Sequence, residues 1–198
     1  MQHEMIINPN ATTIQKIVAA TLNSLNGAAM HFFPNLFVRP STLFVKNGGK
    51  RDQIVVEIGT DKGFNAKTIL DNLDVKMMYL IDPYLEGGFQ GSKKAFDIAK
   101  KRLRKYQDKI EFIQKKSEDA VDDIPDNIDF LYIDGYHTKK QVAMELMLYY
   151  PKMCSGGVLA GHDYVAMHIP LTEAVVEFKQ KNKLELQGGS LDFWMVKP

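Results

Sequence analysis

Short apolar runs and amphipathic stretches alternate along most of the chain, starting at Gln53. The runs have the length and composition of strands, and the stretches between them repeat apolar residues at helical spacing. This alternation predicts βαβ units, which place parallel strands in one sheet with helices on both faces. The expected strands are 53–58, 77–82, 110–114, 128–134 and 157–162, and the expected helices are 64–73, 92–107, 117–123, 138–150 and 171–181.

The end of the chain follows a different pattern, in which "KLELQ" and "LDFWMVKP" flank "GGS". Two β-prone runs around a glycine turn predict an antiparallel hairpin. We therefore expect an α/β protein with a mostly parallel, seven-stranded sheet and an antiparallel last strand.

The first fifty residues lack the βα alternation. Residues 11–30 can form one helix whose apolar side chains share a face. The segment "HFFPNLFVRPSTLFVKNGGK" follows, and its prolines, aromatics and closing glycines predict a loop or lid that ends in a linker at 47–50. We expect residues 1–50 to form a helix and a lid that caps the substrate, and residues 51–198 to form the main domain.

Length and composition limit the classes of protein that need to be considered. A chain of 198 residues with 45% apolar and 25% charged residues suits one soluble domain. The net charge of +1 and the lack of a long apolar run argue against nucleic-acid and membrane partners. Cys154 is the single cysteine, which excludes an internal disulfide, and "MQHEMIINPN" is unlike a signal peptide. We expect a cytoplasmic protein.

Polar residues gather where the expected strands end. Ligands of open parallel sheets bind beyond the carboxyl ends of the strands, so these residues predict a binding site. They are Glu57, Gly59, Asp61 and Gly63 after the first strand, Asp82 after the second, Ser117 and Glu118 after the third, Asp134 and His137 after the fourth, and His162 and Asp163 after the fifth.

Asp82 lies 25 residues after Glu57, at the end of the second expected strand. A carboxylate there can hold two ribose hydroxyls, which indicates a ligand with a nucleoside. "IDP" can also be a turn signal, so a structural role for Asp82 stays open. The dinucleotide pattern G-x-G-x-x-G and the phosphate-binding pattern G-x-x-x-x-G-K-[ST] are both absent from the sequence, which disfavours NAD and FAD.

Four segments in this order, "VEIGTDKGFNAKTIL", "YLIDPY", "FLYIDGYH" and "GGVLAGHDY", resemble class I S-adenosylmethionine-dependent methyltransferases. The likeness is greatest to the small-molecule branch whose fourth strand ends in IDG-x-H and whose fifth ends in HD. It covers roughly residues 53–198 and implies a Rossmann-like fold. The family usually places substrate-binding lid elements before this region.

The resemblance implies a role for each residue of the cofactor site. The turn from Gly59 to Gly63, which contains Asp61, would approach the methionine part of S-adenosylmethionine, and Glu57 would face its ammonium group. Asp82 would hold the ribose. The remaining contacts would come from Ser117 and Glu118 to the adenine and from Asp134 near the methyl group.

Methyl transfer to a hydroxyl also needs a base, and His137 and His162 are the candidates, together with Asp163. Some similar enzymes bind a divalent cation after the fourth and fifth strands, which here would involve Asp134, His162 and Asp163. His162 stands where those enzymes usually have an acid, which leaves a softer metal or no metal as alternatives.

The resulting hypothesis is O-methylation of a small polar acceptor, such as a sugar or a natural product. N-methylation of a small molecule, and a noncatalytic nucleoside-binding module, remain alternatives. The expected partner is the small-molecule acceptor, and a homodimer is kept as one assembly state.

Overall fold

The computed structural model describes residues 38–85, 93–164, 169–189 and 192–198, and every structural statement below concerns these residues. The strands are β1 (Gln53–Ile58), β2 (Val75–Ile81), β3 (Ile110–Ile113), β4 (Ile128–Ile133), β5 (Met153–His162), β6 (Leu186–Gly189) and β7 (Asp192–Val196). The α-helices are α3 (Pro40–Asn47), α4 (Phe64–Asn72), α5 (Lys93–Leu103), α6 (Ser117–Ala120), α7 (Lys139–Tyr149) and α8 (Ile169–Asn182), with short 3₁₀ segments at Arg104–Lys109, Val121–Asp123 and Tyr150–Lys152.

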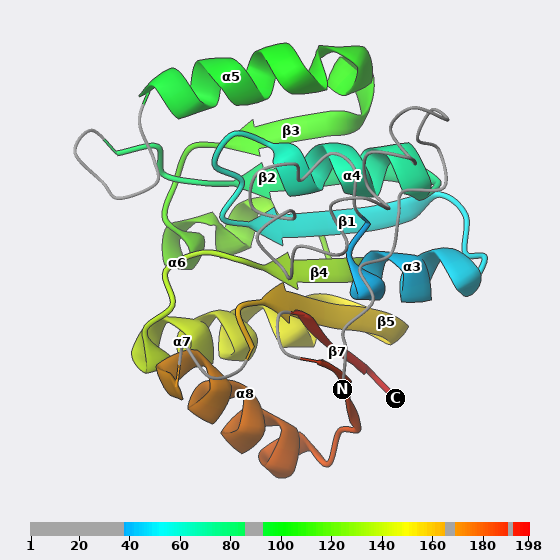
Figure 1. The fold of residues 1–198 in the computed structure, drawn as a ribbon, viewed down its shortest axis with the longest axis vertical. Coiled ribbons are helices and arrows are strands. Elements are labelled where there is room, and N and C mark those ends of the chain that lie inside the picture. The colour runs from blue at the N-terminus through cyan, green and yellow to red at the C-terminus, as the bar shows by residue number, and fades with distance from the viewer. Residues whose placement is uncertain (1–37, 86–92, 165–168, 190–191) are drawn as a thin grey trace, which may run out of the picture.

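One sheet of seven strands, in the order β3-β2-β1-β4-β5-β7-β6, organises the protein (Figure 1). Strands β1 to β5 pair in parallel, and β7 pairs antiparallel with both β5 and β6. The direction of the strand order reverses between β1 and β4, where open α/β sheets bind their ligands. The predicted fold class is confirmed, including the antiparallel end of the sheet.

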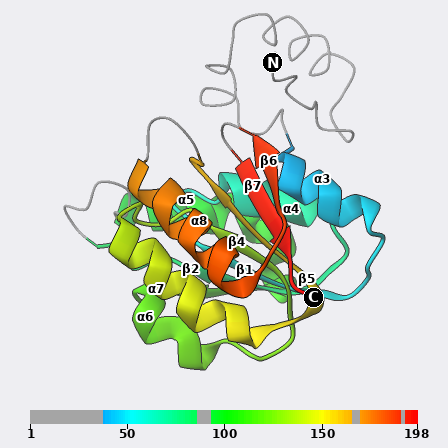
Figure 2. The ribbon, with the colours of Figure 1, turned by 90° about the horizontal axis from the view of Figure 1, so that it is seen from below.

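Helices cover both faces of the sheet, as Figure 2 shows. Helices α3, α4 and α5 lie on one face and α6, α7 and α8 on the other, so each face has its own hydrophobic core. All six residues of β4 are buried, because a central parallel strand is covered from both sides. No helix in the described ranges is long and apolar enough to span a bilayer.

The loop predicted around residue 40 is wrong in part, because residues Pro40–Asn47 form the helix α3. Pro40 occupies the first turn, where its missing N–H costs nothing, and Lys46 lies in the last turn, where a cation is favoured. Phe44 packs against Trp194 of β7 with ring centroids 5.6 Å apart. The predicted helix at 11–30 lies outside the described residues.

The start of α3 is also tied to the last strand by a hydrogen bond. The backbone N–H of Ser41 donates to Oδ2 of Asp192 over 2.8 Å, and Val38 and Val45 are 1% and 6% exposed. The described part of the predicted cap therefore packs on the sheet, next to α4 and β7.

Several element boundaries differ from the prediction, and the two largest differences are in β5 and α5. Strand β5 begins at Met153 rather than at residue 157, because the polar run "CSGG" hides its early pairing with β4. Helix α5 ends at Leu103 and continues as a 3₁₀ segment, in which Tyr106 has non-helical dihedral angles.

Candidate active site

The glycine turn after β1 brings the strand ends close together. Gly59 has a φ of +90°, and a Cβ added there would lie 2.1 Å from the carbonyl oxygen of Asp134. Gly63 has a φ of +70° and directly precedes α4. The close approach of β1 to the end of β4 therefore requires glycine at residue 59.

Gly59→Ala is expected to lower the free energy of unfolding by roughly 2–5 kcal/mol, because it adds a clash to an unfavourable φ. Gly156 is a matched control, since its φ is +78° and an added Cβ would meet nothing within 4 Å. Gly156→Ala should cost only about 1–2 kcal/mol. Urea denaturation of both variants measures the difference, and equal losses would contradict the role assigned to the Gly59 contact.

Glu57, at the end of β1, is a buried carboxyl with one open oxygen. It is 1% exposed, and Nδ2 of Asn65 donates to its Oε1 over 2.9 Å. Its Oε2 is buried and has no hydrogen-bond partner within the part of the chain that the structure describes. Burial raises the pKa of Glu57 to about 8, against the opposing effect of the Asn65 hydrogen bond. Such an oxygen can accept a donor or a cation from a ligand.

Asp82 forms hydrogen bonds to the loops that follow β1 and β2. Its Oδ2 accepts the N–H of Asp61 over 2.8 Å and its Oδ1 accepts the N–H of Tyr84 over 2.9 Å, while the Tyr84 hydroxyl donates to the Asp61 carbonyl over 3.0 Å. Asp61 and Tyr84 both have a positive φ, of 44° and 47°. A positive φ is especially unusual for a bulky aromatic residue such as Tyr84. Asp82 therefore has the structural role in a turn that the sequence had left open. Each carboxylate oxygen still has a lone pair for a ligand hydroxyl.

Ser117 and Glu118 join a polar network with α7. The Ser117 hydroxyl donates to Oε1 of Glu145 over 2.7 Å, and Nε2 of Gln141 lies 3.1 Å from the same oxygen and 3.3 Å from Oε2 of Glu118. The Tyr149 hydroxyl donates to the Ser117 carbonyl over 2.7 Å. The prediction missed Gln141 and Glu145. The available signal was spacing, since Glu145 lies on the buried helix face of Val142, Leu146 and Tyr149.

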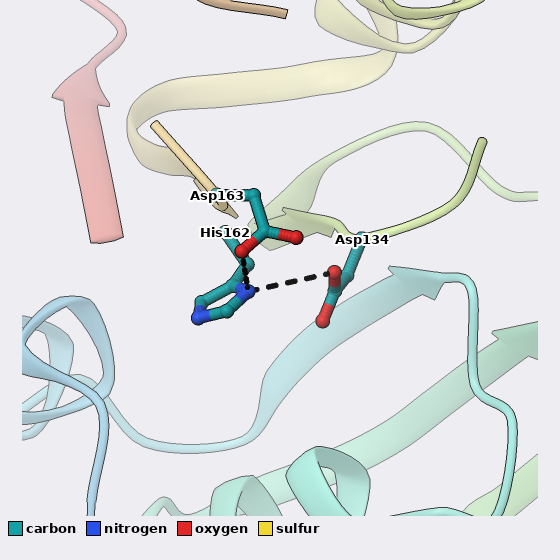
Figure 3. Close-up of side chains that lie close together, drawn as sticks. All are labelled: Asp134, His162 and Asp163. Atoms are coloured by element: carbon teal, nitrogen blue, oxygen red, sulfur yellow. Dashed lines mark ion pairs between the residues drawn. The ribbon is translucent and has the colours of Figure 1, made fainter. Parts of the chain in front are cut away.

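Asp134, His137, His162 and Asp163 converge beyond the ends of β4 and β5. Nδ1 of His162 lies 2.9 Å from Oδ1 of Asp163 and 3.9 Å from Oδ1 of Asp134 (Figure 3). Nε2 of His137 lies 3.4 Å from Asp163 and 3.6 Å from Asp134. Ligand atoms of Asp134, His162 and Asp163 all lie within 4.8 Å of one another, which is compact enough for a cation.

Burial and neighbouring charges set the electrostatics of this cluster. Burial raises the pKa of Asp134 to about 6, while His162 and Arg39 lower it. Burial lowers the pKa of the Arg39 guanidinium, but Tyr132, Asp134 and Asp192 outweigh this effect and raise it. Arg39 is a site residue that the sequence did not predict. It immediately precedes α3, in a segment with no strand-end signal.

Solved structures of other proteins share this fold. An rRNA methylase from Streptococcus thermophilus has a TM-score of 0.62 at 16% identity, over 80% of this chain and 96% of that one. An O-methyltransferase from Bacillus cereus in complex with SAH (S-adenosylhomocysteine) has a TM-score of 0.60 at 17% identity, over 96% of this chain and 93% of that one. Identities this low establish the likeness of fold alone.

Sequence comparison identifies the family. A curated relative, Uncharacterized protein R132 of Acanthamoeba polyphaga mimivirus, is 29% identical over 120 residues, or 58% of this chain. The chain spans about half the length of that relative, with 53% of it covered. A family model described as a methyltransferase domain matches residues 56–164. Because this match includes more than half of the chain and every strand end of the site, the protein belongs to the methyltransferase-domain family.

Proposed function

We propose that this methyltransferase methylates a hydroxyl group of a small polar acceptor, such as a sugar or a natural product, with S-adenosylmethionine as donor. The observation that carries the proposal is the 2.9 Å contact between Nδ1 of His162 and Oδ1 of Asp163, beside Asp134. A histidine oriented by a carboxylate is the arrangement that a general base needs. A hydroxyl acceptor needs such a base more than an amine does, which favours O-methylation over N-methylation.

The residues present fit this cofactor. The open Oε2 of Glu57 suits an ammonium group, and the lone pairs of Asp82 suit ribose hydroxyls. Ser117 and Glu118 are assigned to the adenine, and Asp134 to the neighbourhood of the methyl group. When bound, S-adenosylmethionine supplies a methyl group on a sulfonium centre that is open to in-line attack.

His162 acts as the base in this proposal. With its Nδ1 hydrogen directed at Asp163, its Nε2 keeps a lone pair for the acceptor proton, and this second ring nitrogen points away from both carboxylates (Figure 3). Asp163 fixes the ring and stabilises the imidazolium that forms. The half-buried position of both residues, with side chains 18% and 27% exposed, keeps bulk water from much of the cluster.

A divalent cation is the alternative way to activate the hydroxyl. Asp134, His162 and Asp163 offer two carboxylates and one imidazole, a mixed oxygen and nitrogen set that fits Mn²⁺ or Zn²⁺ better than Mg²⁺. A cation held there would lower the pKa of an acceptor hydroxyl. His137 would then be the group that takes the proton.

The proposal is tested by incubating the purified protein with methyl-labelled S-adenosylmethionine and panels of sugars, phenols and amines. Label transfer to a hydroxyl compound is the expected outcome. Transfer to amines alone would refute O-methylation, and binding of NADH in place of SAH would refute the cofactor assignment.

Binding of SAH at pH 7 is expected to release close to one proton. The Glu57 carboxyl is mostly protonated at that pH because its pKa is about 8, and a ligand ammonium favours the ionised form. Affinity should therefore rise by up to about tenfold per pH unit below pH 8 and level off above it. Calorimetry in phosphate and in Tris, which differ in ionisation enthalpy, counts the protons.

Glu57→Gln should abolish this buffer dependence, because the amide cannot release a proton. Equal binding heats for the wild type in both buffers would contradict the ammonium contact.

A further inference from the structure

Two carboxylates of different elements share one amide donor at the edge of the candidate site. Nε2 of Gln141 lies 3.3 Å from Oε2 of Glu118 and 3.1 Å from Oε1 of Glu145, and 2.9 Å from the Ser117 hydroxyl. Ser117 closes the set by donating to Glu145 over 2.7 Å. Oε2 of Glu145 is buried and has no hydrogen-bond partner among the residues that the structure covers.

The surroundings shift the pKa values of Glu118 and Glu145 in opposite directions. Glu118 is partly exposed, and a hydrogen bond from its own backbone amide, together with that from Gln141, lowers its pKa. Glu145 is 1% exposed, and burial raises its pKa to about 7 despite the hydrogen bonds from Ser117 and Gln141. At neutral pH Glu118 is therefore a pure acceptor at the surface. Two carboxyl groups whose pKa values differ in this way can have different roles. Glu118 can bind a ligand, while Glu145 holds the side chains around it.

The pair spans the edge where the cofactor is proposed to bind. The N–H of Asp82 donates to the carbonyl of Ile113 over 3.1 Å, so the loop with Ser117 and Glu118 starts beside the proposed ribose carboxylate. Oε1 of Glu145 would lie 3.5 Å from a Cβ on Gly135, directly after Asp134. Glu145 thus links the loop after β3 to the turn after β4.

We propose that Glu145, acting through Gln141 and Ser117, is a positioning residue that holds the Glu118 carboxylate where it accepts a hydrogen bond from the amino group of the cofactor's adenine. This inference rests on the proposed use of S-adenosylmethionine. The amino group of adenine is a donor, and the carbonyl that replaces it in hypoxanthine is an acceptor. An ionised Glu118 therefore selects adenine and repels hypoxanthine, but only while its support keeps it in place.

The test compares the affinities of SAH and its hypoxanthine analogue, S-inosylhomocysteine, for the wild type and for Gln141→Ala and Glu145→Ala. We expect the wild type to prefer SAH, and each variant to lose about 10–100-fold in SAH affinity, as for a hydrogen bond to a charged group. The affinity for the inosine analogue should change by less than about threefold, because it never gained the contact.

Two control variants distinguish the possible outcomes. Glu145→Gln retains an acceptor oxygen for Ser117 and should largely restore selectivity, and Met147→Ala, on the exposed side of α7, should change nothing. If Glu145→Ala does not fold, Gln141→Ala alone decides, since Gln141 is only half-buried. Equal weakening of both ligands, or no weakening, would overturn the inference. A wild type that binds neither SAH nor S-adenosylmethionine would refute the proposed function itself.

Discussion

Replacing His162 with alanine is expected to lower the rate of methyl transfer by roughly 10²–10⁴-fold while SAH affinity stays within a few-fold of the wild type. The variant loses the nitrogen proposed to take the acceptor proton but keeps Glu57, Asp82 and Ser117, the groups proposed to bind the cofactor. Asp163→Ala should lower the rate in the same direction, because the 2.9 Å contact that orients the ring is lost. Turnover and calorimetry on the same preparations separate the two effects.

Chelation separates the two versions of the mechanism. If His162 is a base, activity survives EDTA; if Asp134, His162 and Asp163 hold a cation, EDTA abolishes activity and Mn²⁺, Zn²⁺ or Mg²⁺ restores it. The matched control for the His162 and Asp163 variants is Met147→Ala, because Met147 is 62% exposed on α7. Full activity in both His162→Ala and Asp163→Ala would show that the cluster is structural.

Deleting residues 1–50 is expected to destabilise the remaining domain by roughly 5 kcal/mol, a large part of the 5–15 kcal/mol that holds a typical domain together. The deletion removes the burial of Val38 and Val45, worth about 1.5–3 kcal/mol each. It also strips the buried Asp192 carboxylate of its bond from Ser41, which costs about 1–3 kcal/mol.

A second deletion, of residues 1–37, is the control, because it leaves every described contact of α3 in place. It should unfold cooperatively in urea, whereas the chain that starts at residue 51 should unfold at much lower urea or be unfolded already. The same midpoint for both chains would show that α3 is dispensable, as a pure lid would be.

Much of the fold was predictable because its parallel strands are buried on both faces and so read as plain apolar runs. Helix α3 was missed for a physical reason. Its sequence "PSTLFVKN" is too short for a clear helical period, and the proline at its start suggests a loop. It packs against Trp194, some 150 residues further along the chain, and no local sequence pattern contains this contact.

The site was predictable where it lies at strand ends and unpredictable where helices reach over them. Asp134, His137, His162 and Asp163 were expected together because the carboxyl ends of adjacent parallel strands meet at one edge, and the structure brings them together. Asn65, Gln141 and Glu145 lie in helices, and Arg39 immediately precedes one. Acidic and amide residues inside helices usually face solvent, so their role becomes visible only from three-dimensional contacts.

The hydrogen bond from Ser41 to Asp192 joins residues 151 positions apart, which has a consequence for synthesis of the protein. Ribosomes add about 5–20 residues per second, so β7 emerges roughly 8–30 s after α3. Throughout that interval Phe44 has no Trp194 to pack against. The entropy cost of closing so long a loop can be offset by this contact only after β7 has been made. The nascent chain therefore carries Pro40–Asn47 without its contacts to β7 until that strand is made, and we expect this segment to stay accessible to chaperones and proteases during the interval.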